Sequence, residues 1–428
     1  MLSWTEPTVP RLPGTAPIPR VFDDSTGTLI AATPVDGRVG LYVCGITPYD
    51  ATHLGHASTY VAFDTLYRAW LDAGLGVDYA QNVTDVDDPL LERATATGVD
   101  WRELAASQTN LYREDMAALR VIPPFDYVAV TDVVGPVSEA VARLVELGFA
   151  YEVPTPDALN AGASDLYFDV DAASASTSWH LGFESRLDVD TMMSHFTARG
   201  GDPLRVGKRN AFDPLLWRVA RAGEPSWPSP VGEGRPGWHI ECSVIALDVL
   251  GTSFAVQGGG SDLVFPHHEF SAAHATALTG ESFAEVYAHS GMVAYQGEKM
   301  SKSLGNLVLV SNLRASGIAP GAVRLAVLEH HYRSDWEWTD AGLAASVSRL
   351  EAWRAVLAPA TPPVFAGDVD SFSGAESELA LLGRLRAHLA NDLDTPSAIA
   401  EVDAWILTSP TTTDLIRRAV DALLGVAL

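Results

Sequence analysis

Two short motifs carry side chains suited to phosphate chemistry. The first, Thr52-His53-Leu54-Gly55-His56, places two imidazoles where a helix is expected to begin, beside a glycine that allows close backbone approach. The second, Lys299-Met300-Ser301-Lys302-Ser303, offers two ammonium groups and two hydroxyls in a loop, which suits the charge on a leaving pyrophosphate. Taken singly, the first motif also fits a capped helix start with surface histidines, and the second fits a solvated basic loop.

Lysine usage favours a chemical role for the second motif. The 428-residue chain holds only three lysines, Lys208, Lys299 and Lys302, and two of them lie in this loop. Arginine supplies the remaining positive charge. The chain's general use of lysine therefore does not explain why Lys299 and Lys302 lie so close together.

The elements that must position the first motif follow a strand–helix–strand pattern. Residues 39–43 form a short apolar run that ends at Cys44-Gly45, residues 59–71 carry apolar side chains at helical spacing, and residues 77–83 form a second apolar run. This order predicts a βαβ unit of a parallel sheet. Another strand, at 254–257, runs into Gly258-Gly259-Gly260, where a nucleotide could approach the backbone at the carboxyl end of a strand.

The chain therefore reads as an α/β protein with a parallel sheet, an insertion and a helical C-terminal bundle. The expected divisions are an irregular lead-in over 1–38 with one hairpin, a first half of the parallel-sheet domain over 39–150, an insertion over 151–205, a second half over 206–310 and a helical domain over 311–428.

Composition narrows the class of protein. The formal net charge of −26 argues against a broad electrostatic surface for nucleic acid. Two cysteines cannot provide a disulfide scaffold for a chain of this length, which indicates a reducing, cytoplasmic compartment. No apolar run is long enough for a membrane helix, and the first residues do not resemble a signal peptide.

Together and in this order, the two motifs resemble the signatures of class I aminoacyl-tRNA synthetases. Longer stretches resemble the cysteinyl-tRNA synthetase branch: residues 41–56 (LYVCGITPYDATHLGH), 82–88 (NVTDVDD), 227–242 (WPSPVGEGRPGWHIEC) and 258–269 (GGGSDLVFPHHE). The resemblance covers roughly residues 38–345. It implies a Rossmann nucleotide-binding domain that uses ATP with Mg²⁺ as a substrate.

The resemblance also implies one zinc ion that grips the thiol of a substrate cysteine. The family's ligand positions fall on Cys44, Cys242 and His267, and these are the only two cysteines of the chain. Their spacing in the sequence does not reveal such a site, and without the resemblance each cysteine would be read as a small buried apolar side chain.

Further roles follow from the family's motifs. His53 and His56 would stabilise the phosphoryl transition state, and Lys299 and Lys302 the leaving pyrophosphate. Asp262 would either act as the base for the second substrate or order the glycine-rich loop. The residues expected around the adenylate are Cys44, Gly45, Ile46, Thr47, Thr59, Asn82, Val83, Thr84, Trp238, Gly260, Ser261, Asp262 and Val293.

Two departures from the synthetases point to a related ligase family. Ser271 stands where the synthetases carry a metal-proximal glutamate, and the terminal anticodon-reading domain is expected to be missing. With the segment 199–203 (RGGDP) also present, the chain resembles the cysteine:glucosaminyl-inositol ligases of mycothiol biosynthesis. Such an enzyme would activate L-cysteine with ATP as cysteinyl-adenylate and transfer it to the amine of glucosaminyl-inositol. It would need no tRNA or membrane and would act as a monomer.

Three alternatives remain open from the sequence. The chain could be a cysteinyl-tRNA synthetase that lacks the anticodon-binding domain, or a non-catalytic relative that only binds metal or a partner. The acidic run Asp85, Asp87 and Asp88 could be read as a metal site, although capping of the following helix is the favoured interpretation.

Overall fold

A five-stranded parallel sheet forms the centre of the molecule. The computed structural model describes residues 1–50, 52–300, 305–357, 376–408 and 414–428, without the side chain of Lys299. The sheet has the order β11-β10-β3-β4-β5. Its strands are β3 (Arg38–Val43), β4 (Gly76–Val83), β5 (Asp126–Ala129), β10 (Phe254–Gly260) and β11 (Ala284–Ser290). This sheet confirms the predicted α/β class and the βαβ unit.

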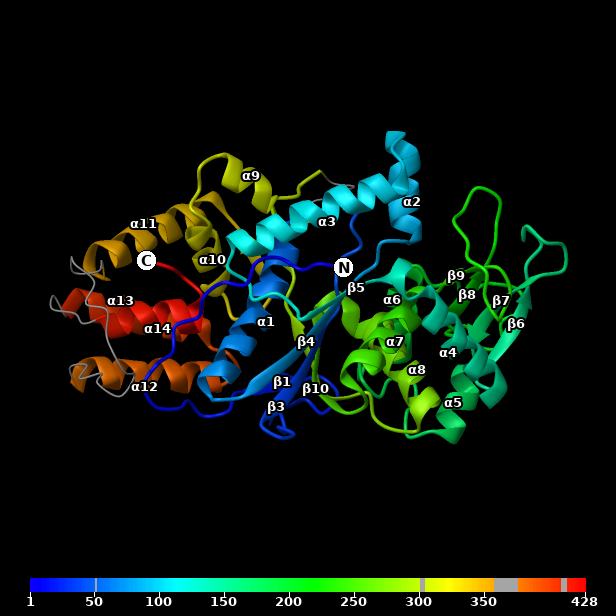
Figure 1. Ribbon diagram of the computed structural model, residues 1–428, viewed down its shortest axis with the longest axis horizontal. Coiled ribbons are helices and arrows are strands. Elements are labelled where there is room, and N and C mark those ends of the chain that lie inside the picture. Colours follow the sequence, from blue (N-terminus) through cyan, green and yellow to red (C-terminus); the bar gives the residue numbers. More distant parts are fainter. Residues whose placement is uncertain (51, 301–304, 358–375, 409–413) are drawn as a thin grey trace.

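Two apolar cores cover the two faces of this sheet. Along β3, Leu41 and Val43 enter one core and Tyr42 enters the other, because successive side chains of a strand point to opposite faces. The first core contains α1 and the C-terminal helices, and the second contains helices α4, α7 and α8 (Figure 1). The helices of the sheet region are α1 (Leu54–Asp72), α2 (Asp88–Thr97), α3 (Trp101–Ala118), α4 (Val134–Leu147), α7 (Trp238–Leu250) and α8 (Glu269–Thr279).

The insertion is an antiparallel sheet of four strands that lies at the end of the molecule opposite the C-terminal helices (Figure 1). It contains β6 (Ala150–Pro154), β7 (Ser164–Phe168), β8 (Leu215–Val219), β9 (Gly234–Pro236), and helices α5 (Val170–Ser176) and α6 (Val189–Ala198). This sheet extends to residue 236, beyond the expected boundary at 205. The reason is that β8, with Leu216 and Trp217 fully buried, pairs with β7 and not with the central sheet.

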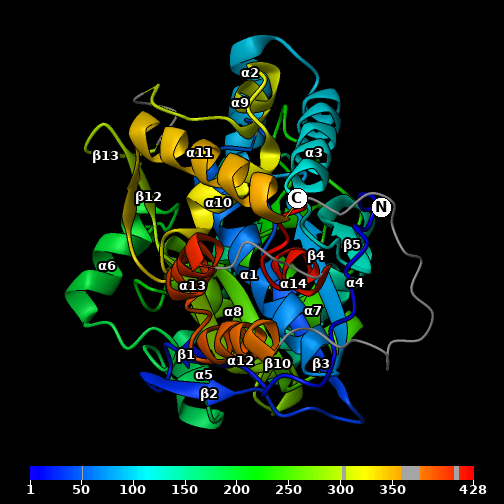
Figure 2. The ribbon, with the colours of Figure 1, turned by 90° about the vertical axis from the view of Figure 1, so that its left-hand side faces the viewer.

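The N-terminal lead-in forms the expected hairpin, with β1 (Arg20–Asp23) antiparallel to β2 (Thr28–Ala31). A small sheet of β12 (Val293–Tyr295), β13 (Glu298–Lys299) and β14 (Trp336–Trp338) follows the central sheet. The C-terminal part is helical, as predicted, and Figure 2 shows its last helices stacked beside α1. Its helices are α9 (Val310–Ala315), α10 (Pro320–Leu328), α11 (Asp340–Leu357), α12 (Glu376–Ala390), α13 (Thr395–Thr408) and α14 (Asp414–Leu424). In the parts of the chain that the structure describes, every helix is too short or too polar to span a bilayer.

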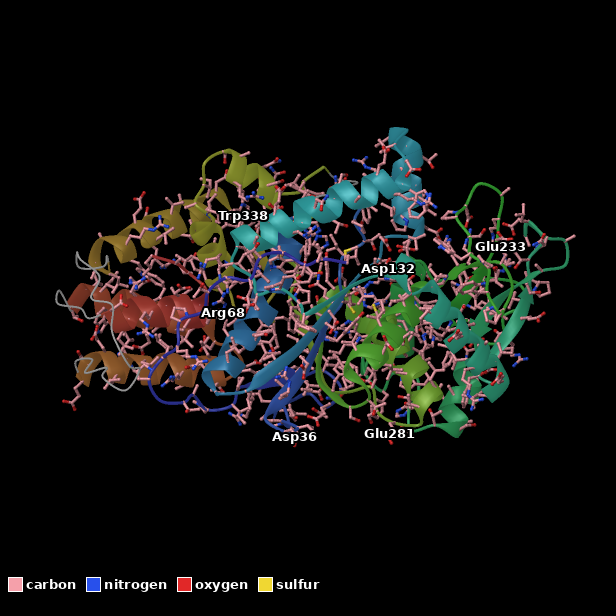
Figure 3. All side chains as sticks on the ribbon, viewed as in Figure 1. Asp36, Arg68, Asp132, Glu233, Glu281 and Trp338 are labelled. Atoms are coloured by element: carbon pink, nitrogen blue, oxygen red, sulfur yellow. The ribbon has the colours of Figure 1, made fainter. Side chains whose placement is uncertain are left out.

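A buried cluster of charges joins α1 to the C-terminal helices. Asp64 of α1 accepts hydrogen bonds from Arg68 Nε (2.7 Å), from Arg324 of α10 and from the backbone N–H of Ile122 (2.7 Å). Burial opposes the charged form of Asp64, but the two guanidinium groups hold the pKa of this carboxyl below its usual value. Figure 3 shows Arg68 where α1 meets the C-terminal helices.

The same two arginines satisfy the ends of helices. Arg68 donates to the carbonyls of Asp421 and Ala422 at the end of α14, and Arg324 donates to those of Leu424 and Leu119. Carbonyl groups at a helix end lack partners within the helix, so the guanidinium groups replace the water that the core excludes.

Replacing Asp64 with alanine tests this cluster. Asp64→Ala leaves two buried guanidinium groups without their carboxylate, and we expect a loss of about 3–5 kcal/mol in the free energy of unfolding. Urea denaturation would measure it. Arg143→Ala is the control, since the Arg143–Glu146 pair is exposed and should contribute at most about 1 kcal/mol. Equal losses in the two variants would contradict the role of the cluster.

Candidate active site

The site lies at the carboxyl ends of the central strands, where β3, β10 and β11 give way to loops. Cys44 directly follows β3, Ser261 follows β10 and Gly291 follows β11. A cavity of about 370 Å³ opens there. Open parallel sheets bind ligands at this edge because the strands end at a common crevice.

The first motif enters the cavity at the start of α1, as predicted. The Nδ1 atom of His53 accepts a hydrogen bond from the backbone N–H of Gly55 (3.0 Å), so His53 caps the helix that follows it. The rings of His53 and His56 are stacked, with centroids 3.9 Å apart. Two imidazoles and the positive end of a helix therefore meet at one wall of the cavity, which suits a phosphate.

The glycine-rich strand end lies opposite this wall. A Cβ atom on Gly258 would meet Phe63 of α1 at 2.4 Å, and one on Gly260 would meet the carboxylate of Asp262 at 2.6 Å. Thr59 of α1 reaches across to Ser290 at the end of β11, with 2.7 Å between the hydroxyl oxygens. The missing side chain at Gly258 lets Phe63 of α1 pack against β10, and Gly260 leaves the end of β10 open to the cavity.

Most of the predicted residues line this cavity. The lining includes Cys44, Gly45, Ile46, Thr47, His53, His56, Thr59, Trp238, Gly260, Asp262 and Val293. In the described part of the chain, Asn82, Val83, Thr84 and Ser261 stand outside that lining. Lys299 belongs to β13, and Lys302 lies outside the described residues.

Asn82 and Thr84 support the cavity wall from behind. Asn82 is buried, and its Oδ1 atom accepts hydrogen bonds from the backbone N–H of Gly45 (2.7 Å) and from the hydroxyl of Tyr42 (3.2 Å). Its amide nitrogen donates to Thr84 (3.1 Å). These residues therefore hold the Gly45 loop in place, and their contact with an adenylate stays a prediction.

Both cysteines converge with His267 on one buried point. Cys44 Sγ lies 3.8 Å from Cys242 Sγ, and His267 Nε2 lies 3.2 Å from Cys242 Sγ. The three candidate ligand atoms lie within 4.8 Å of one another. Cys44 comes from the end of β3, Cys242 from α7 and His267 from the turn Val264–His268. Two sulfurs and one imidazole nitrogen are a donor set that suits zinc with one open position.

The surroundings of the cluster also fit a metal. His267 Nδ1 faces His239 Nδ1 at 3.1 Å, so a proton on His267 Nδ1 would leave its Nε2 lone pair for a cation. Burial, with Cys44 alongside, raises the pKa of the Cys242 thiol well above its usual value. A cation would therefore be needed to stabilise the thiolate form.

Ser271 takes no part in this donor set. Its hydroxyl donates to the carbonyl oxygen of His267 at 2.7 Å, one turn earlier in the chain. The described residues thus place three protein ligands at the cluster, and the position held by glutamate in the synthetases supports the His267 backbone instead.

A chain of imidazoles behind the cluster was not predicted. His268 Nε2 lies 3.2 Å from Cys44 Sγ, and His268 Nδ1 lies 2.7 Å from Nε2 of His289 on β11. His289 Nδ1 in turn donates to Asp24, next to the N-terminal hairpin, at 2.5 Å. Sequence reasoning could not find this chain, because single histidines in distant segments carry no spacing signal.

Other side chains near the cavity were present in the quoted motifs but were given no role. Tyr49 and Asp50 line the cavity, and Asp50 pairs with Arg93 of α2 at 3.1 Å. Glu269, the last residue of the HHE segment, accepts hydrogen bonds from Trp179, Gly182 and Ser185 of the insertion. Glu269 therefore anchors the turn that carries His267.

The acidic run has the structural role that was favoured. Asp87 caps α2 by accepting from the backbone N–H of Asp88 (2.8 Å), and Asp85 accepts from both the backbone N–H and the hydroxyl of Thr131. Asp88 pairs with Arg235 of β9.

Comparisons with known proteins agree with this geometry. Residues 31–348 match the family described as the tRNA synthetases class I (C) catalytic domain. The chain is 63% identical to the L-cysteine:1D-myo-inositol 2-amino-2-deoxy-alpha-D-glucopyranoside ligase of Clavibacter michiganensis subsp. michiganensis, over 100% of this chain and 99% of that protein. It is 56% identical to the ligase of the same name from Kineococcus radiotolerans, over 100% of both chains.

Solved structures of synthetases share the fold. The methionyl-tRNA synthetase of Mycobacterium tuberculosis, in complex with methionyl-adenylate, superposes with a TM-score of 0.57 at 17% identity, over 91% of this chain and 88% of that chain. A leucyl-type synthetase of Agrobacterium radiobacter K84, in a ternary complex, superposes with a TM-score of 0.59 at 11% identity, over 92% of this chain and 83% of that chain. Fold, motifs and full-length identity lead to one conclusion: the chain belongs to the family of L-cysteine:1D-myo-inositol 2-amino-2-deoxy-alpha-D-glucopyranoside ligases, within the class I (C) synthetases.

Proposed function

We propose that this chain is an ATP-dependent ligase that joins L-cysteine to the amine of glucosaminyl-inositol. The observation that carries the proposal is the Cys44–Cys242–His267 cluster, which adjoins the cavity that contains His53 and His56. A thiol-binding point beside a phosphate-binding point suits a cysteine that is activated by ATP. The 63% identity to a ligase named for these two substrates supports the choice of acceptor.

A zinc ion would be held by Cys44, Cys242 and His267, and it would supply a Lewis acid with one position open for a thiolate. Trp238 stacks on the ring of His267, with centroids 4.4 Å apart, and so lies between the cluster and the cavity. A substrate cysteine can offer a thiolate there, whereas serine offers a weaker hydroxyl ligand. Selection against serine then needs no separate editing site.

In the first step, a carboxylate oxygen of cysteine attacks the α-phosphorus of ATP, and the bond to the pyrophosphate oxygen breaks. His53 and His56 would stabilise the charge that develops on the phosphoryl oxygens, since both rings lie at the helix N-terminus. Lys299 and Lys302 would balance the charge of the leaving pyrophosphate. The backbone at Gly260 would leave room for the nucleotide.

In the second step, the amine nitrogen attacks the adenylate carbonyl, the bond to the AMP oxygen breaks and an amide forms. The acceptor must first lose an ammonium proton, so a base is required. Asp262 lines the cavity beside Gly260 and is our candidate for this base. The substrates are all small molecules, and we propose that the enzyme works as a cytoplasmic monomer without tRNA.

Supplying each acceptor in turn tests the proposal. With ATP and radiolabelled cysteine, we expect label to enter glucosaminyl-inositol and not tRNA, with stoichiometric release of AMP. Cysteine-dependent ATP–pyrophosphate exchange alone would not distinguish the ligase from a cysteinyl-tRNA synthetase, because both make the adenylate. Transfer to tRNA without transfer to glucosaminyl-inositol would reject our choice in favour of the synthetase. An active adenylation step would exclude a non-catalytic relative.

Replacing either cysteine tests the zinc site. Cys44→Ser and Cys242→Ser should each lower bound zinc well below one ion per chain and abolish cysteine activation, because a hydroxyl is a poor substitute for a thiolate. Metal analysis of purified protein would measure the loss. Ser271→Ala is the matched control, since the Ser271 hydroxyl bonds to a backbone carbonyl, and it should keep its zinc. Full zinc occupancy in a cysteine variant would contradict the assignment.

The signature lysine can be tested in the same way. Lys302→Ala should lower the rate of pyrophosphate exchange, because one positive charge opposite the leaving group is removed. Its zinc content should stay at the wild-type value, which separates a catalytic loss from a folding defect. An unchanged exchange rate would remove the role assigned to this residue.

A further inference from the structure

The segment that follows the lysine signature lies against the start of α1. The backbone N–H of Leu54 donates to the carbonyl of Val308, and the N–H of Val310 donates to the carbonyl of Thr52, both at 3.0 Å. His53 and Leu309 form an antiparallel bridge between these two hydrogen bonds. His53 is therefore held on a short two-stranded contact whose other strand is residues 308–310.

A largely buried ion pair joins α3 to the helix that follows this contact. Arg314 of α9, four residues after Val310, donates to Asp115 Oδ1 of α3 at 2.5 Å. The Asp115 side chain is fully buried, and Glu114 lies 3.8 Å from the same guanidinium. Thr52, in the other strand of the contact, is also fully buried. Asp115 thus pairs with α9, the helix that continues directly from residues 308–310.

This pair is not explained by stability. Burial raises the pKa of Asp115 to about 6 in spite of Arg314, so the fold bears a net electrostatic penalty for the charged carboxylate. Buried ion pairs often contribute little to stability, but they fix the orientation of what they join. Here the pair joins α3 to α9, and residues 308–310 before α9 bridge to residues 52–54.

We infer that Asp115 and Arg314 are positioning residues for the adenylation step. Through Arg314, Asp115 holds residues 308–310 against residues 52–54 and so sets the position of His53 at the wall of the cavity. Both residues act through these strands, and neither lines the cavity. The inference rests on the proposed function, since it needs ATP activation to occur at His53.

Kinetics of variants that remove one charge of the pair test this role. Asp115→Asn and Arg314→Met should each lower kcat for cysteine-dependent pyrophosphate exchange by about tenfold or more, since small displacements of a catalytic group reduce transition-state stabilisation. The KM for cysteine and the zinc content should stay within twofold of wild type, because the cysteine cluster lies on other elements. Arg314→Lys should recover part of the rate, and the double variant should be no slower than the slower single variant, because both changes break the same interaction.

Arg386→Met is the matched control. Arg386 of α12 pairs with Asp72, the last residue of α1, at 2.7 and 2.8 Å, so this variant breaks a similar largely buried pair at the opposite end of the same helix. It should lower the melting temperature but leave kcat within twofold of wild type. The inference is overturned if Asp115→Asn and Arg314→Met lose no more activity than this control. If the wild-type protein shows no exchange at all, the proposed function fails and the inference fails with it. If Asp115→Asn does not fold, Arg314→Met, whose side chain is 29% exposed, decides the question.

Discussion

The arrangement of the C-terminal helices and of the cavity depends on the position of α1, and the buried carboxylate of Asp64 holds α1 in place. Asp64 lies halfway along α1, between the guanidinium groups of Arg68 and Arg324. These arginines also donate hydrogen bonds to backbone carbonyls at the ends of α14 and α3. If α1 moved relative to the C-terminal helices, a buried charge would lose its partner. The N-terminus of the same helix carries His53 and His56. A buried electrostatic interaction in the core therefore helps to determine where His53 and His56 lie at the edge of the sheet.

The other half of the site is held by a different part of the chain. Cys242 belongs to the core that faces the insertion, and Glu269 anchors the turn that carries His267 to residues of that insertion. Cys44 lies between the two halves of the site, because it directly follows β3, whose side chains enter both cores. The loop between α5 and α6 of the insertion thus supports the turn that carries His267. The site therefore needs elements from both faces of the central sheet: α1 on one face, and α7 with the His267 turn on the other.

Local features of the structure were predictable from the sequence, and distant ones were not. The start of α1 followed from histidines beside a glycine, and β3 and β4 followed from apolar runs. The meeting of Cys44, Cys242 and His267 came only from family resemblance, because 198 residues separate the two cysteines and no periodicity links them. The four-stranded sheet continues past residue 205 to β9, and a short strand such as β8 carries no pattern that shows which sheet it will join. The hydrogen bond from the backbone N–H of Gly45 to the Asn82 side chain was likewise not visible in the sequence, because it joins two separate strand ends.

The close approach of Gly45 to Asn82 has a consequence for how this protein can vary. A Cβ atom on residue 45 would lie 1.6 Å from the Asn82 carbonyl oxygen, and one on Gly237 would lie 2.0 Å from that of Leu215. No side chain can be fitted at such distances without moving a strand. Among descendants of this chain, the codons for these two glycines should therefore tolerate only silent nucleotide changes, while neighbouring surface codons drift. Gly45 and Gly237 belong to stretches by which the family is identified, and short backbone distances, not reaction chemistry, require glycine at both positions.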